Sequence, residues 1–202
     1  DDTYFFTDEF VGGTTLTDSN GGTDTLNFAA VRGDITGNLD TQISVDGKIL
    51  TLNGTFENLI TGDGNDVVTD NAQNNVIFTG RGDDVLTMGG GNDAIDGGVG
   101  NDTAIFQNAI QDYNFEILNA TSFQISTSVG TTGTDTLDNF ETFSFNGATY
   151  TASQLTDYIN GLPPAAISIK FVTSDGFNKY HTSDADITQT LTTANLNVAG
   201  TN

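Results

Sequence analysis

Residues 61–105 read TGDGNDVVT DNAQNNVIF TGRGDDVLT MGGGNDAID GGVGNDTAI, five windows of nine residues that follow one another without a gap. Four windows have glycine at the second and fourth places and aspartate at the sixth, and all five have an aliphatic residue at the eighth. Self-similarity at a fixed period indicates a solenoid in which each repeat stacks on its neighbours.

Each window divides into a turn and a strand. Glycine admits the positive φ angles of tight turns, so the first half of the window predicts a turn. The second half predicts a three-residue strand with an apolar residue at its centre. The central residues are Val68, Ile77, Leu86, Ile95 and Ala104.

The aspartates of alternate windows form a set of their own. Asp66, Asp84 and Asp102 recur every eighteen residues, so they stack along one edge if two windows make one coil. Unpaired carboxylates in a column would repel one another. Calcium takes about six to eight oxygen ligands in flexible geometry, and the carbonyls of glycine-rich turns can join the carboxylates. We therefore predict two calcium sites on this edge, one between Asp66 and Asp84 and one between Asp84 and Asp102.

The opposite edge is degenerate. It carries Glu57, Asn75 and Asp93 at the corresponding places, and two of the usual glycines are missing from the window of Asn75. Because Asn75 offers only a neutral amide oxygen, we expect calcium to bind weakly or not at all beside it. The repeat register is lost beyond Asp93, and Asp112 lies close enough in sequence to complete a site with Asp93.

Gly-Asn-Asp and Gly-Asp-Asp steps also form β-turns without any metal, but five copies in frame favour calcium. Ordering nine residues costs roughly 9 to 18 kcal/mol of backbone entropy, whereas burying one aliphatic side chain returns about 1.5 to 3 kcal/mol. Strand pairing closes part of that gap. We therefore hypothesise that the repeats are largely disordered without calcium and fold when it binds.

Four windows, TGDGNDVVT, TGRGDDVLT, MGGGNDAID and GGVGNDTAI, resemble the RTX (repeats-in-toxin) nonapeptide GGxGxDxUx of hemolysin-type proteins. The resemblance implies an all-β fold, a right-handed parallel β-roll, with type I secretion of the unfolded chain and folding in extracellular calcium. Carried over place by place, the family's calcium ligands are the carboxylates of Asp66, Asp84, Asp93 and Asp102 and turn carbonyls from Gly62, Gly64, Gly80, Gly82, Gly89, Gly91, Gly98 and Gly100.

The composition agrees with a thin, acidic solenoid. Only 36% of the 202 residues are hydrophobic, and 27 acidic against 5 basic residues give a net charge of −22. This charge argues against binding nucleic acid or an anionic membrane and favours cations as partners. The chain has no cysteine, so calcium takes the stabilising role that disulfides often have in extracellular proteins.

Residues 1–60 carry a looser version of the pattern. We expect irregular solenoid turns here, forming the N-terminal part of the roll, with a hairpin or coil turn at Asp46-Gly47. Asp2 and Asp24 are weaker candidates for a further calcium site. The first residues look like the second half of another nonapeptide, so we expect a fragment of a longer polypeptide. The sequence shows no signal peptide and no membrane-spanning run, and either type I export or excision from a longer polypeptide would explain the missing signal.

Residues 106–161 are rich in aromatics and predict a β cap that closes the roll, followed by a short helix over about 152–160. A sugar-binding aromatic platform is the alternative for this cap. Thr134 to Leu137 echo the Thr-Asp-Thr-Leu order of Thr23 to Leu26. Two adjacent prolines mark a linker at 162–166, and 167–202 predict a strand and a helix that could open a following domain.

No enzymatic constellation stands out. His181 is the only histidine and lacks a zinc signature around it, and no GxSxG elbow is present. The leading function is a non-catalytic calcium-binding module of a secreted bacterial protein. Two alternatives remain, a structural, adhesive or surface-layer spacer that self-associates, and an accessory domain of a secreted hydrolase such as a protease or lipase that contacts adjoining domains of the same polypeptide.

Overall fold

The computed structural model describes residues 1–128 and 133–161. These residues lie within one compact unit, Asp1–Ala165. The linker at 162–166, the strand and helix expected in 167–202, and His181 fall outside the described residues. Among the described residues, no helix is long and apolar enough to cross a membrane.

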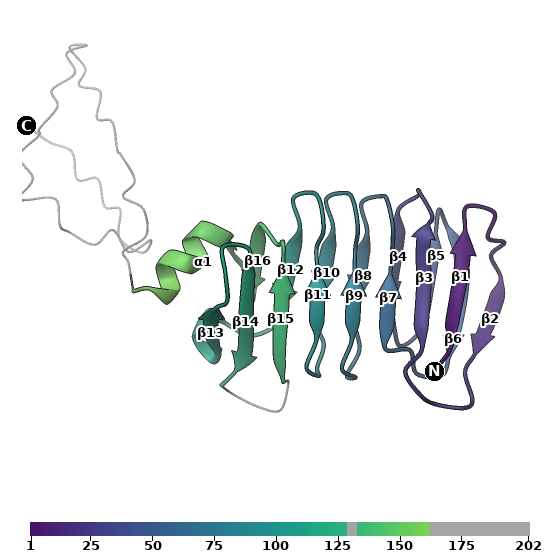
Figure 1. Cartoon of the computed structure of the whole chain (residues 1–202), viewed down its shortest axis with the longest axis horizontal. Coiled ribbons are helices and arrows are strands. Elements are labelled where there is room, and N and C mark those ends of the chain that lie inside the picture. The colour runs from purple at the N-terminus through teal and green to yellow at the C-terminus, as the bar shows by residue number, and fades with distance from the viewer. Residues whose placement is uncertain (129–132, 162–202) are drawn as a thin grey trace, which may run out of the picture. The chain divides into compact units, whose positions relative to one another are not determined.

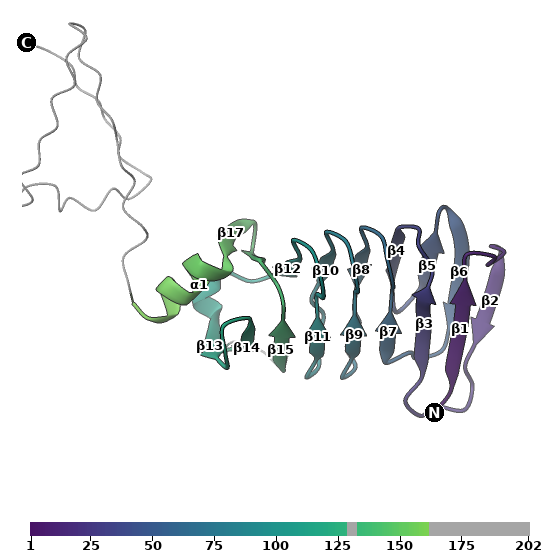
Figure 2. The same ribbon diagram turned by 45° about the horizontal axis from the view of Figure 1, so that its top comes forward.

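The described strands form two sheets, which face each other along a common axis in Figure 1 and, turned by 45°, in Figure 2. In spatial order the first sheet contains β1 (Thr3–Thr7), β3 (Thr25–Ala30), β7 (Asn58–Ile60), β9 (Val76–Phe78), β11 (Ala94–Asp96), β15 (Thr134–Asp138), β14 (Ser122–Thr127) and β13 (Tyr113–Ile117). The second contains β17 (Ala148–Thr151), β16 (Thr142–Phe145), β12 (Thr103–Phe106), β10 (Val85–Thr87), β8 (Val67–Thr69), β4 (Ile35–Asn38), β5 (Gln42–Val45), β6 (Lys48–Asn53) and β2 (Thr14–Thr17).

The nonapeptide windows alternate between the two sheets. Val85 pairs in parallel with Val67 in one sheet, and Ala94 pairs with Val76 in the other, so each register step is eighteen residues. The expected β-roll with two windows per coil is therefore confirmed. The central aliphatic residues of the five strands are buried between the sheets, at most 2% exposed, and they are Val68, Ile77, Leu86, Ile95 and Ala104.

The coil resumes after residue 105, although the sequence pattern ends there. The chain leaves the stack after β12 to form the 3-10 turn η1 (Ile110–Asp112) and the antiparallel strands β13 and β14. It returns as β15 and β16, which pair in parallel with β11 and β12. Ile95 faces Leu137 and Ala104 faces Phe143 in this pairing, so the repeat's core positions continue through the insertion.

A second insertion lies near the N-terminus. Strands β5 and β6 form an antiparallel hairpin in which Val45 pairs with Lys48, and the turn residues Asp46 and Gly47 have φ angles of 48° and 77°. Positive φ at both central positions is the hairpin geometry that an Asp-Gly step favours. Of the two alternatives expected at Asp46-Gly47, a hairpin or a coil turn, the structure shows the hairpin. Strand β7 then rejoins the coil in parallel with β3.

Helix α1 (Ala152–Ile159) follows the last hairpin and lies at the end of the stack beside β13 and β16 in Figure 1. A capping box starts it, in which Thr151 accepts from the Gln154 amide and the Gln154 side chain accepts from the Thr151 amide. Leu155 is fully buried, and Tyr158 contacts Phe115 edge to face. The helix thus covers apolar side chains at this end of the stack.

Candidate metal sites at the two edges of the sheets

The turns that lead from the first sheet to the second stack directly on one another. These turns, 61–66, 79–84 and 97–102, form what we call the Asp84 edge. Neighbouring turns are joined by backbone hydrogen bonds, including 2.9 Å from the Arg81 amide to the Gly62 carbonyl oxygen and 3.0 Å from the Gly82 amide to the Val99 carbonyl oxygen.

The glycines of these turns are required by close approach of the backbone. Gly82 has a φ of 136°, and a Cβ there would overlap the carbonyl oxygen of Gly64. In the same way, a Cβ at Gly80 would overlap the carbonyl oxygen of Gly62, and a Cβ at Gly98 would overlap that of Gly80. Only glycine combines this conformation with this spacing, so the sequence pattern fixes how closely the coils stack.

A ladder of hydrogen bonds connects the aspartates of this edge. The Asp66 amide donates to Asp84 Oδ1 at 2.8 Å, and the Asp84 amide donates to Asp102 Oδ1 at 2.9 Å. Asp66 Oδ1 itself accepts from the Ile35 amide at 2.7 Å, and the Asp102 amide donates to Glu141 Oε2 at 2.8 Å. The three aspartates therefore form one column, as the eighteen-residue period indicates, and Glu141 continues it.

The second carboxylate oxygen of each aspartate has no hydrogen-bond partner. Oδ2 of Asp66, Asp84 and Asp102 is buried and unpaired, and these residues are at most 1% exposed. Burial raises the pKa of Asp66 to about 6 and that of Asp102 to about 7, and it also raises the pKa of Asp84. Buried polar atoms nearly always have partners, so these oxygens are suited to a cation.

Basic side chains do not supply a positive charge beside these buried carboxylates. Within 1–128 and 133–161 the one ion pair is between Arg81 and Asp63, 3.4 Å apart, and it is exposed to solvent. Burying carboxylates without a counter-charge costs several kcal/mol each. A hard divalent cation bound to carboxylate and carbonyl oxygens is the chemistry that this edge fits.

We call the opposite edge the Asn75 edge; it consists of the turns 70–75 and 88–93 and the return at 133–135. The contacts between one turn and the next, which we call junctions, differ along this edge. Asn75 Nδ2 donates to the Glu57 carbonyl oxygen at 2.7 Å, and Asn71 Nδ2 donates to the Phe56 carbonyl oxygen at 2.9 Å. These side-chain amides occupy backbone acceptors that could otherwise face an ion.

One junction further along, the acidic column returns. The Asn75 amide donates to Asp93 Oδ1 at 2.8 Å, and the Asp93 amide donates to Asp135 Oδ1 at 3.3 Å. The structure corrects the expectation for Asp112, because Asp135 and not Asp112 lies beside Asp93. Asp112 instead ends η1, where its backbone carbonyl accepts from the Ser128 amide. Burial raises the pKa of both Asp93 and Asp135.

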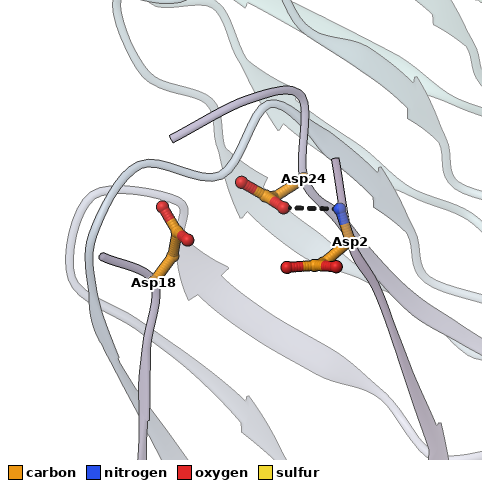
Figure 3. Close-up of side chains that lie close together, drawn as sticks. All are labelled: Asp2, Asp18 and Asp24. Carbon is orange, nitrogen blue, oxygen red and sulfur yellow. Dashed lines mark hydrogen bonds between the residues drawn. The ribbon is translucent and has the colours of Figure 1, made fainter. Parts of the chain in front are cut away.

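A third acidic cluster lies near the N-terminus, where Figure 3 shows Asp2, Asp18 and Asp24 around one point. One carboxylate oxygen of each lies within 4.8 Å of those of the other two. Asp24 Oδ1 accepts from the Asp2 amide at 2.7 Å, and the Asp24 amide donates to Glu57 at 2.7 Å. Asp24 is 1% exposed and its Oδ2 is buried without a partner.

Sequence reasoning missed Asp18, Asp135 and Glu141. A signal for Asp135 was present, because the Thr-Asp-Thr-Leu order at 134–137 repeats the one that contains Asp24, and the two aspartates belong to the same column. Asp18 lies in the loop after β2, and no repeat in the sequence relates it to the other aspartates. No repeat relates Glu141 to Asp102 either, because the two residues are thirty-nine residues apart rather than eighteen.

The stacked parallel coils, the glycine turns and the columns of buried carboxylates define a β-roll repeat protein. A comparison with protein families matches the RTX calcium-binding nonapeptide repeat (4 copies) to residues 53–86, 60–93 and 71–104. Residues 53–104 therefore belong to this repeat family, and they indicate a calcium-binding β-roll module. A comparison with curated proteins found no match to the chain.

Proposed function

We propose that this chain is a non-catalytic module of a secreted protein, and that it folds and becomes stable when extracellular calcium binds between its coils. The observation that carries the proposal is the set of buried carboxylate oxygens without partners at the turns. Oδ2 is in this state in Asp24, Asp66, Asp84, Asp93 and Asp102.

On the Asp84 edge we assign one ion to each junction between stacked turns. Asp66 and Asp84 would hold the first ion and Asp84 and Asp102 the second, each with their free Oδ2 atoms. Turn carbonyls would complete both shells, and the candidates are Gly62, Gly64, Gly80, Gly82, Gly98 and Gly100. Calcium tolerates irregular shells of carboxylate and carbonyl oxygens, whereas magnesium demands a near-ideal octahedron.

Two further places suit an ion of the same kind. Asp2, Asp18 and Asp24 would hold one at the N-terminal cluster. Asp93 would contribute another on the Asn75 edge, where Gly89 and Gly91 belong to the same turn. We assign none to the junction between Glu57 and Asn75, because Asn75 supplies a neutral amide in place of a carboxylate and the side-chain amides bond to the facing carbonyls.

Calcium-dependent folding supports an extracellular location for the module. The cytosol holds little free calcium, so a chain of this kind would stay unfolded there, as export through a type I system requires. Without calcium, the buried carboxylates would repel one another and each would bear its desolvation cost. Ion binding therefore supplies folding free energy directly.

The test is far-ultraviolet circular dichroism of the chain in about 10 mM calcium, in about 10 mM magnesium and in EGTA, because about 10 mM calcium saturates even weak extracellular sites. We expect a β-sheet spectrum in calcium and its loss in magnesium or EGTA. An unchanged spectrum in EGTA would refute calcium-dependent folding. Incubation with peptide, ester and polysaccharide substrates tests the non-catalytic assignment, for which we expect no turnover.

A further inference from the structure

Asp70 is the most unusual acidic residue of the Asn75 edge. It is 2% exposed, and both of its carboxylate oxygens are buried without a hydrogen-bond partner. It stands at the first place of the degenerate window, where the repeat pattern calls for no carboxylate. The proposed function does not use it.

The neighbouring coils have apolar side chains at the position of Asp70. Strand β8 pairs with β4 and β10, and β10 pairs with β12, so the residues one place beyond Asn38, Thr69, Thr87 and Ile105 fall in one column. That column consists of Leu39, Asp70, Met88 and Phe106, and its three apolar members are at most 5% exposed. A carboxylate in such a column needs a compensating partner.

Comparison with the Asp84 edge shows what such a partner must do. The first places of those windows hold Thr61 and Thr79, whose hydroxyls donate to the carbonyl oxygens of Thr79 and Gly97 at 2.6 and 2.8 Å. An ionised Asp70 can accept but cannot donate, so it cannot replace a threonine in this ladder. It is suited to a cation or a proton.

The surroundings of Asp70 are acidic. Burial first, and then the charges of Asp93, Asp135 and Asp40, raise the pKa of Asp70 to about 8. Asp93 and Asp135 are themselves 3% and 8% exposed. Asp70 is therefore near enough to Asp93 and Asp135 for their charges to act on it, and the Asp93 amide donates to Asp135 Oδ1.

We propose that Asp70 is a calcium ligand and that, together with Asp93 and Asp135, it forms a site in which the degenerate repeat supplies a carboxylate from its first place. This inference rests on the proposed function and extends it. The Glu57 junction of the same window is closed by amides and stays metal-free. The degenerate window thus loses an ion on one side and holds one on the other.

The test compares the variant Asp70→Asn with Asp40→Asn, using calcium bound per chain at saturation, measured by equilibrium dialysis. Asp40 is an exposed carboxylate whose charge also acts on Asp70, so its variant removes the same charge nearby without removing a buried oxygen. We expect Asp70→Asn to bind one ion fewer than wild type and Asp40→Asn to bind the wild-type number. An unchanged count in Asp70→Asn would mean that Asp70 is a buried, protonated acid and would overturn the inference.

A second measurement covers the case in which Asp70→Asn does not fold. Crystals of the wild-type chain grown with calcium should give an anomalous peak within bonding distance of the Asp70 carboxylate. A map with peaks on the Asp84 edge and none at Asp70 would overturn this inference and leave the proposed function intact. Wild-type protein that binds no calcium would refute the proposed function itself.

Discussion

Replacing Asp84 by asparagine should change the response to calcium more than any other single substitution on its edge. Asp84 lies in the middle of the column, where its Oδ1 accepts from the Asp66 amide at 2.8 Å and its Oδ2 is buried and unpaired. Asparagine keeps the accepting oxygen and replaces Oδ2 by a donor. The variant Asp84→Asn therefore preserves the ladder but removes a ligand from two proposed ions.

The magnitude follows from linkage. Each ion that binds only the folded state adds about 1.4 kcal/mol to the free energy of unfolding for every tenfold rise in calcium above its dissociation constant. Losing two ions lowers that slope by about 2.8 kcal/mol per tenfold rise. Without calcium the variant should be more stable than wild type, because a buried neutral amide costs less free energy than a buried unpaired carboxylate. The stability curves of wild type and variant should therefore cross.

The assay is guanidinium unfolding followed by circular dichroism across a calcium series. The matched control is Asp83→Asn, because Asp83 is the exposed neighbour of Asp84 and its Oδ1 accepts from the Asn101 amide at 2.9 Å, a bond that asparagine can also accept. The control should follow the wild-type slope. Parallel curves for Asp84→Asn and wild type would refute the assignment of ions to this column.

Three other outcomes follow from the structure. Gly82→Ala should lower the free energy of unfolding by about 1 to 3 kcal/mol for backbone strain and by about 1 to 3 kcal/mol more for overlap with the Gly64 carbonyl. The control Gly147→Ala, also at positive φ but with open space around it, should lose only the first amount. Chemical denaturation in calcium compares the two variants. Leu86→Ala should cost about 2 to 5 kcal/mol, measured in the same way, because Leu86 is fully buried. Burial raises the pKa values of Asp66, Asp102 and Asp70 to about 6, 7 and 8. Above about pH 4 and without calcium, the folded state therefore binds more protons than the unfolded state. The free energy of unfolding in calcium-free buffer should accordingly fall as pH rises from 5 to 8. Circular dichroism after passage over a chelating resin should show more strand at pH 5, and equal spectra at both values would contradict this reasoning.

The period of nine made much of this fold predictable. Alternation of turn and strand located β8 to β12 and their buried centres, and doubling the period placed Asp66, Asp84 and Asp102 in one column. These inferences succeeded because glycine turns of constant length leave the chain a single way to stack. Asp24 and the hairpin at Asp46 were also visible as local turn signals.

The remainder depends on contacts that are distant in sequence. Asp135 lies forty-two residues after Asp93, so no fixed period connects them, and only the return of β15 to the sheet reveals the pair. Asp70 was overlooked for a different reason. It occupies a place where the repeat has no ligand, and its burial depends on Leu39 and Met88 in the coils on either side.

The two insertions leave the coil at the same edge. The hairpin β5–β6 follows the end of β4, and the insertion that contains β13 and β14 follows the end of β12. Both insertions therefore lie in connections that run from the second sheet to the first. The described crossings in the other direction are all short. Foreign loops or whole binding segments could accordingly be grafted at the places of these two insertions without disturbing the Asp84 edge, whereas lengthening a crossing such as 79–84 would separate the oxygens that have to meet.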